Sequence, residues 1–226
     1  MLRTQFNRAR ATALGTLGAM GVIIAFILGL GSNTSYGDRV RFIDAFGLGL
    51  VLPVGALIFA SASIGDLIED QTLVYLTMRP VNRGKIALAA FAASLSIVLP
   101  LVAIPLVASA AAARLDADAI LATVLASGIG AFAYCGVFCA LGTRLRRALA
   151  VGLIYVFIWE QFVARASRGV RRWTISAYTR TILKNLTDVR LRDADMNQAA
   201  AIVIPLAIGC VAVLLVIHWL RTRDIA

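Results

Sequence analysis

The sequence has few charged residues and few of the side chains from which enzymes build catalytic or metal sites. Only 15% of its 226 residues are charged, and it contains one histidine and three cysteines. With His218 as the single histidine, neither a paired His–Glu metal motif nor a Ser–His–Asp set can form. The Gly84-Lys85 pair lacks the upstream glycine spacing of a Walker A loop. We therefore expect that this chain is not an enzyme, has no catalytic residue and binds no metal or cofactor.

The cysteines indicate no disulfide framework, because their number is odd. Two of them, Cys135 and Cys139, lie one helical turn apart in an uncharged run. A buried free cysteine usually behaves as a small apolar residue. We interpret both as packing residues in a membrane span.

Apolar residues take the place of these groups and make up 60% of the chain. Uncharged runs of more than about 18 residues are candidates for membrane-spanning helices. The sequence predicts an all-α integral membrane protein with a single transmembrane domain over residues 1–226. Its six transmembrane helices are expected at about residues 13–30, 42–63, 86–111, 119–142, 148–163 and 199–220.

The net charge of +10 has a topological meaning in such a protein. In a soluble chain it would suggest a nucleic acid partner, which we do not expect here. Lysine and arginine gather near the N-terminus, in residues 65–85, in the 144–147 turn and at the C-terminus. The positive-inside rule therefore predicts that both termini and residues 65–85 are cytoplasmic. Residues 165–198 disagree, because they are expected outside and are also rich in basic residues.

Within residues 165–198, a basic face and an apolar stripe repeat at helical spacing. The basic face contains Arg172, Ser176, Arg180 and Lys184, and the stripe contains Trp173, Ala177, Tyr178 and Ile182. This pattern predicts a basic amphipathic helix that lies on an anionic membrane surface, with membrane lipids as its partner. Selection of an anionic substrate is the alternative hypothesis.

Glu160 is an ionisable residue inside the predicted 148–163 span, and Trp159 precedes it. A carboxylate within a membrane is costly and by default suggests a functional site. We predict for Glu160 and Trp159 a role in gating or in support of the outer loop. The alternative is a hydrated carboxylate near the outer interface, with Trp159 as an aromatic-belt anchor.

Residues 65–85 form a polar segment between the second and third predicted spans. Ile68, Thr72, Tyr75, Leu76 and Arg79 share one face of a helix, and Asp66, Glu69, Asp70 and Thr77 lie largely on the other. Pro80 ends this helix, because proline lacks a backbone N–H and disfavours helical geometry in the residue before it. The sequence predicts a short amphipathic helix that lies at the membrane interface or docks into a soluble partner.

The pattern Glu-Asp-x-Thr-Leu-x-Tyr-Leu-x-x-Arg-Pro-x-x-Arg, from Glu69 to Arg83, resembles the first cytoplasmic loop of type-2 ABC transporter permeases. The resemblance extends to the six predicted spans and to the Trp-Glu pair late in the fifth. In that family the loop carries the coupling helix that contacts the ATP-hydrolysing subunit. The resemblance implies an exporter in a bacterial-type cell (inner) membrane. Two permease chains, identical or different, would face two cytoplasmic ABC ATPase subunits, which would bind ATP and Mg.

The resemblance also implies which residues couple the permease to the ATPase. These residues are Glu69, Asp70, Thr72, Leu73, Tyr75, Leu76, Arg79, Pro80 and Arg83. The charged ones before the proline would make polar contacts, and the leucines and the tyrosine would supply the apolar anchors from which interfaces gain most of their energy. Pro80 and Arg83 would fix where the third span starts.

Two other classes of function stay open. A polytopic membrane enzyme acting on lipids would use Asp66, Glu69 and Asp70, whose spacing also suits the N-terminus of a helix. A membrane scaffold would show no dependence on an ATPase. The substrate of a transporter is open as well, since a mostly apolar interior would suit a lipid, a hydrophobic drug or a peptide.

Overall fold

The computed structural model describes residues 8–31, 34–69, 83–145, 147–163, 172–189, 191 and 196–222, and these form helices joined by short turns, without a strand among them. In chain order the helices are α2 (Arg8–Leu30), α3 (Tyr36–Phe42), η1 (Ile43–Val51), α4 (Leu52–Glu69), α6 (Arg83–Val98), η2 (Leu99–Ala103), α7 (Ile104–Ala112), α8 (Ala117–Arg144), α9 (Ala148–Ile154), η3 (Tyr155–Val163), α12 (Ile175–Thr187) and α13 (Gln198–Thr222). The three η segments are π-helical. The predicted all-α class is confirmed for the described residues.

Most of the predicted spans are confirmed as long apolar helices. The stretches long and apolar enough to cross a membrane are Arg10–Leu30, Tyr36–Ser63, Gly84–Ala112, Ala117–Arg144 and Gln198–Thr222. Each contains one predicted span, so together they indicate a multi-pass membrane protein. The remaining prediction, residues 148–163, falls on α9 and η3, and the apolar helix there, Ala148–Gln161, is shorter than the others.

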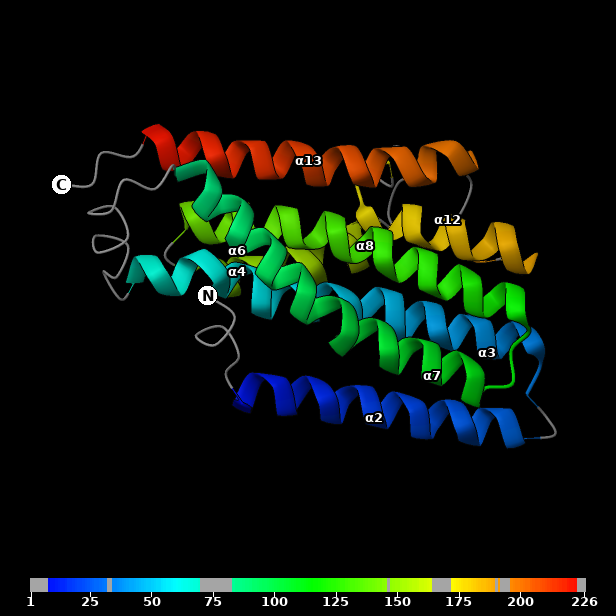
Figure 1. Ribbon diagram of the computed structural model, residues 1–226. Helices are drawn as coiled ribbons and strands as arrows, with labels where there is room; N and C mark the ends of the chain where they lie inside the picture. Colours follow the sequence, from blue (N-terminus) through cyan, green and yellow to red (C-terminus); the bar gives the residue numbers. More distant parts are fainter. Residues whose placement is uncertain are drawn as a thin grey trace.

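The long helices lie side by side around α8 (Figure 1). α8 packs against α4, α13 and α12, whereas α2 lies at the edge of the bundle, where it packs mainly on α7. α8 starts beside the end of α7 and runs to the opposite end of the bundle, and α13 runs the same way from the end where α3 begins (Figure 1). α12 begins part-way along the bundle and finishes at the end from which α13 starts.

Residues with small side chains allow the helices around α8 to approach closely. A Cβ atom added to Gly142 of α8 would lie 2.4 Å from the backbone oxygen of Ser61 in α4. A Cβ atom added to Gly136 would lie 2.8 Å from the backbone oxygen of Gly209 in α13. Small residues at such contacts are the usual means by which membrane helices pack, since lipid provides little hydrophobic driving force between them.

Replacing Gly142 with alanine is expected to lower the midpoint of thermal unfolding in detergent, because the new methyl group forces α4 and α8 apart at a cost of about 1–3 kcal/mol. Gly128 of the same helix is the matched control, since a Cβ atom there meets nothing within 4 Å. Gly128→Ala should leave the midpoint unchanged or raise it, because alanine is the better helix former by about 1 kcal/mol. Equal midpoints for the two variants would contradict the close contact.

Two of the π-helical segments are explained by proline. η1 ends shortly before Pro53, and η2 contains Pro100 and is followed at once by Pro105. Proline has no N–H to donate and its ring clashes with the preceding turn, so the regular hydrogen-bond ladder is interrupted there. η3 contains no proline. Since π-helical turns often accompany functional sites, the residues of η3 are candidates for such a site.

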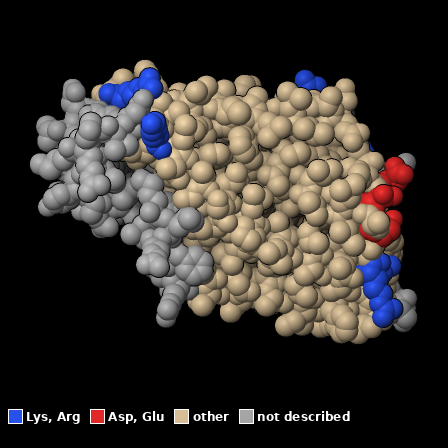
Figure 2. Space-filling view, in the orientation of Figure 1, with Lys and Arg blue, Asp and Glu red and all other residues tan. Residues whose placement is uncertain are grey.

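Charged side chains gather at the two ends of the bundle. Where α4, α8 and α13 finish, the described charged side chains are Arg10, Lys85, Arg144, Arg147 and Arg221. We call this the basic end. The opposite end carries both signs, with Asp38, Arg41, Arg114, Asp116 and Asp118. Figure 2 shows this distribution, with a flank between the ends that is almost entirely free of charge.

Candidate functional site

Glu160 of η3 is buried inside the bundle, with only 1% of its surface exposed. Its carboxylate accepts hydrogen bonds from the hydroxyl group of Tyr134 in α8 and from that of Tyr155, the latter at 3.3 Å. A third donor is the backbone N–H of Ile175, the first residue of α12, at 3.3 Å. The first N–H groups of a helix lack partners within it, and its N-terminus is partially positive. Glu160 therefore ties the start of α12 to α8 and η3.

A buried ion pair joins α12 to η1. Nε of Arg180 donates a hydrogen bond to Oδ1 of Asp44 at 3.1 Å, and the two residues are 6% and 8% exposed. Burial of a charge is costly unless the charge is paired and hydrogen-bonded. Arg180 therefore compensates the carboxylate of Asp44, which comes from a distant segment of the chain.

Gln161 links η3 to η1 as well. Its side-chain amide donates a hydrogen bond to the backbone oxygen of Gly49. A Cβ atom at Gly49 would lie 3.3 Å from that amide nitrogen and 3.4 Å from a guanidinium nitrogen of Arg180. The missing side chain of Gly49 thus lets two polar groups approach the backbone of η1.

These residues form one site, which we call the buried polar cluster: Asp44, Gly49, Tyr134, Tyr155, Glu160, Gln161 and Arg180. It connects η1, α8, η3 and α12 inside an otherwise apolar bundle. Ionisable residues inside membrane helices are rare, pair with one another and mark substrate or ion pathways. The cluster can hold or redistribute charge, and it fixes the position of α12.

The two predicted residues of the fifth span point to different surroundings. Glu160 lies in the buried polar cluster, so the alternative of a hydrated carboxylate at the interface is wrong. Support of the following segment requires a contact with it, and the hydrogen bond from the Ile175 N–H to Glu160 is such a contact. A role in gating stays a prediction. Trp159 is 38% exposed and contacts the surroundings of the bundle, as an aromatic-belt residue does.

The predicted ATPase-coupling residues fall almost entirely outside the described residues. Asp70, Thr72, Leu73, Tyr75, Leu76, Arg79 and Pro80 lie there. Glu69 is the last residue of α4 and Arg83 is the first of α6, so the described chain reaches both edges of the segment. Both edges lie at the basic end of the bundle (Figure 1).

The predicted amphipathic helix exists, but its predicted place on the membrane surface is wrong. α12 packs against α8, α13 and η1, and its residues from Ile175 to Leu183 are all buried. Arg180 pairs with Asp44 instead of facing lipid headgroups. Trp173, assigned to the apolar stripe, precedes the helix and is 76% exposed.

The physical reason is that polar groups of α12 are bonded within the protein. The hydroxyl of Thr179 donates to the backbone oxygen of Ser176 at 3.0 Å, and that of Thr181 donates to the backbone oxygen of Ala177 at 2.8 Å. Hydroxyl groups that are bonded in this way can be buried at little cost. With Arg180 paired to Asp44, these groups do not require water or headgroups.

Sequence reasoning does not single out Asp44, Tyr134, Tyr155 or Gln161. A signal for Asp44 is present, because it lies inside the predicted 42–63 span and an acid there needs a partner. The excess of basic residues in 165–198 offers that partner. The tyrosines and the glutamine carry no pattern that distinguishes them from other residues of a membrane helix.

The structure supports no metal centre in the part of the chain that it describes, where no three His, Cys, Asp or Glu residues come together. Cys135 and Cys139 are buried in α8, and Sγ of Cys139 lies 3.4 Å from Oγ of Ser63. Their interpretation as small packing residues is confirmed.

No protein-family model matches the chain, and no curated protein sequence matches it. Functional inference therefore depends on the chain's own residues and their arrangement.

Proposed function

We propose that the protein is the membrane-spanning permease subunit of an ATP-driven transporter of the ABC exporter type. The observation that carries the proposal is the buried polar cluster, in which Asp44, Glu160 and Arg180 lie within a bundle of apolar helices. Soluble cores bury charges for many reasons, but in a membrane each such charge is expensive and marks a pathway or a moving part. The N-terminus of an interrupted helix beside a carboxylate is also typical of transporter sites.

In this proposal the chain crosses the membrane six times, and the fifth crossing is made of two pieces. α8 ends at the basic end and α13 starts at the opposite end, so the chain between them has to cross once (Figure 1). The 16 residues of α9 and η3 would span only about 24 Å of a hydrocarbon layer of about 30 Å. α12 completes the crossing, and the buried polar cluster lies where the two pieces meet.

The basic end is the cytoplasmic end in this proposal. Its described charged side chains are basic, as the positive-inside rule requires of short cytoplasmic segments. Residues 70–82 connect α4 to α6 at this end, where an ATPase subunit would be accessible to them. The resemblance of this segment to a coupling helix implies the identity of the partner, which is two cytoplasmic ABC ATPase subunits beneath a pair of permease chains. ATP hydrolysis would then move α4 and α6, which continue directly from this segment.

The test is purification of the tagged chain in mild detergent, with identification of co-purifying proteins and assay of ATPase activity. We expect an ATPase with Walker motifs in a one-to-one ratio. Changing both Tyr75 and Leu76 to aspartate is expected to remove it, since charged residues in the centre of an apolar contact cost several kcal/mol of binding, on the order of a 100-fold or greater loss of affinity.

Thr77→Asp is the matched control, because Thr77 lies on the opposite face of the predicted coupling helix. It should retain the ATPase. A wild-type chain that purifies alone at near-native expression, without ATPase activity, would refute the transporter proposal. The lipid enzyme and the scaffold would then be the remaining hypotheses.

A further inference from the structure

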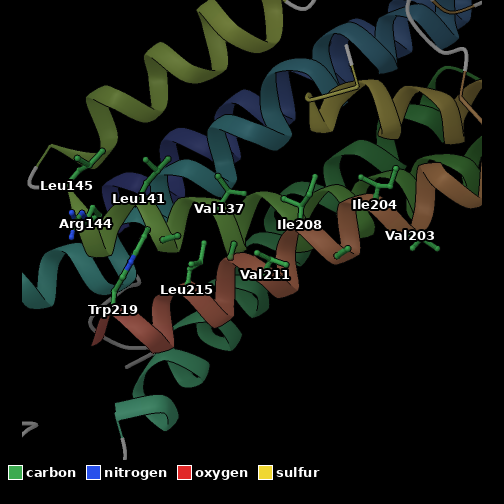
Figure 3. A pocket seen from close by; sticks show the side chains of 13 residues that line it. Val137, Leu141, Arg144, Leu145, Val203, Ile204, Ile208, Val211, Leu215 and Trp219 are labelled. Carbon is green, nitrogen blue, oxygen red and sulfur yellow. The ribbon is translucent and has the colours of Figure 1, made fainter. Parts of the chain in front are cut away.

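An apolar groove of about 600 Å³ runs between α8 and α13 on the outer side of the bundle. Figure 3 shows its walls, with Val137 and Leu141 of α8 on one side and Ile208, Val211 and Leu215 of α13 on the other. Val211 is 55% exposed and Leu215 is 41% exposed, so the groove opens sideways toward the surroundings of the helices. In a membrane those surroundings are lipid chains.

The two helix backbones touch next to residues that line the groove, since Gly136 precedes Val137 and Gly209 follows Ile208. Gly136 of α8 meets Gly209 of α13, where an added Cβ atom would lie 3.0 Å from the Cα atom of Gly209. The contact keeps the helices together at this point, while the larger side chains on either side form the walls. The groove is therefore a fixed feature of helix packing.

One end of the groove lies at the basic end of the bundle, where Arg144 is among its lining residues. The guanidinium of Arg144 lies 5.8 Å from the centre of the Trp219 ring, in a cation–π contact. Figure 3 shows both side chains beside Leu145 at the end of the groove. Arg144 is exposed, and Arg147 and Arg221 are exposed at the same end. The rest of the lining is apolar.

We propose that this groove binds an anionic phospholipid, with one acyl chain along α8 and α13 and the phosphate group at Arg144. From Val203 to Trp219 the groove follows 16 residue-to-residue steps of α13, about 24 Å. One leaflet of the hydrocarbon layer is about 15 Å deep, so a chain that enters from the surface fits within this length. Guanidinium groups bind phosphate oxygens through two parallel hydrogen bonds, and Trp219 is of the residue type that favours the headgroup level.

The dimensions favour a lipid chain over a helix of a second copy. About 600 Å³ spread over a length of about 24 Å leaves a mean cross-section of only about 25 Å², which is far too narrow for an α-helix about 10–12 Å wide with its side chains. The charge favours an anionic headgroup, because basic sites between membrane helices on the cytoplasmic side bind acidic lipids. The inference does not depend on the transport function, since a lipid can be held for stability alone.

The test is native mass spectrometry of the detergent-purified full chain, titrated with phosphatidylglycerol or with phosphatidylcholine that carries the same acyl chains. We expect tighter binding of phosphatidylglycerol by roughly tenfold or more, because no choline cation offsets the charge of its phosphate, so the Arg144 guanidinium gains more from pairing with it. Arg144→Gln should abolish this preference, and Arg144→Lys should retain part of it. Ala207→Phe, which fills the groove, should weaken the binding of both lipids.

Two matched variants separate a site from general attraction. Arg147→Gln removes a neighbouring exposed charge outside the lining, and Ala89→Phe adds a ring on an exposed face of α6. Both should bind like the wild type. Equal binding of the two lipids, a loss in Arg147→Gln as large as that in Arg144→Gln, or normal binding by Ala207→Phe would each overturn the proposal. Unfolding midpoints of all variants identify any that lose lipid because they misfold.

Discussion

Replacing Asp44 with asparagine is expected to destabilise the folded protein by about 3–5 kcal/mol, because it leaves the Arg180 guanidinium buried without its charged partner. The side chains of Arg180 and Asp44 are only 8% and 12% exposed. Arginine cannot lose its proton in a protein, so the stranded charge persists. Arg180→Gln is expected to be milder, because the carboxyl group of Asp44 can take up a proton and become neutral. The double variant should recover much of the stability, since it leaves no unpaired charge.

A neighbouring exposed ion pair provides the matched control. Nη1 of Arg41 lies 3.3 Å from Oδ1 of Asp38, but these side chains are 61% and 52% exposed. Water screens such a pair, so Arg41→Gln should change stability by less than about 1 kcal/mol. The measurement is the unfolding midpoint of each variant in a denaturant titration in detergent. If Arg180→Gln has no larger effect than Arg41→Gln, the buried pair does not hold α12 in place.

Replacing Glu160 with leucine is expected to release the start of α12. The change removes the acceptor of three donors, the hydroxyls of Tyr134 and Tyr155 and the N–H of Ile175. Each buried donor left unsatisfied costs about 1–3 kcal/mol. The Ile175 N–H cannot reorient, so its hydrogen exchange should accelerate more than that of amides near the end of α12. Hydrogen exchange followed by mass spectrometry of the α12 peptide measures this directly.

Two further substitutions separate the carboxylate's charge from its hydrogen bonds. Glu160→Gln keeps an acceptor oxygen and the volume of the side chain, so α12 should stay protected. Gln161→Leu removes the adjacent link to Gly49 but keeps the Glu160 acceptor, and it should accelerate the exchange of Ile175 less than Glu160→Leu does. Unaltered exchange in Glu160→Leu would show that Glu160 does not cap the helix. If Glu160→Gln preserves protection but abolishes transport, the charge itself has a function.

The sequence predicted a membrane span wherever one helix alone is long enough to cross the membrane. The uncharged runs in α2, α8 and α13 are longer than a membrane is thick, and their length alone indicates a span. The positions of the turns follow from the same runs, because arginine and aspartate mark their ends. Residues 148–163 differ in this respect, because the apolar helix there, Ala148–Gln161, is too short for its length alone to indicate a span.

The buried polar cluster was only partly predictable, because its partners are distant in the sequence. Glu160 stands out as an acid in an apolar run, but its donors come from α8 and α12. The four-residue spacing around Arg180 suits a surface helix as well as a buried one. The period identifies one face of the helix but does not say whether lipid, water or protein covers that face. The excess of basic residues beyond 165 conflicts with the positive-inside rule, and the burial of Arg180 against Asp44 removes only one of the eight from that excess.

The ion pair between Asp44 and Arg180 also constrains how the chain is made. Its two residues are 136 positions apart, so at about 5–20 residues per second the ribosome needs roughly 7–27 s to reach Arg180 after Asp44. During this time Asp44 lacks the Arg180 guanidinium with which it pairs in the folded protein. The donors of Glu160, by contrast, lie only 26 positions before and 15 positions after it. The contact between η1 and α12 therefore forms long after the residues of η1 have been made.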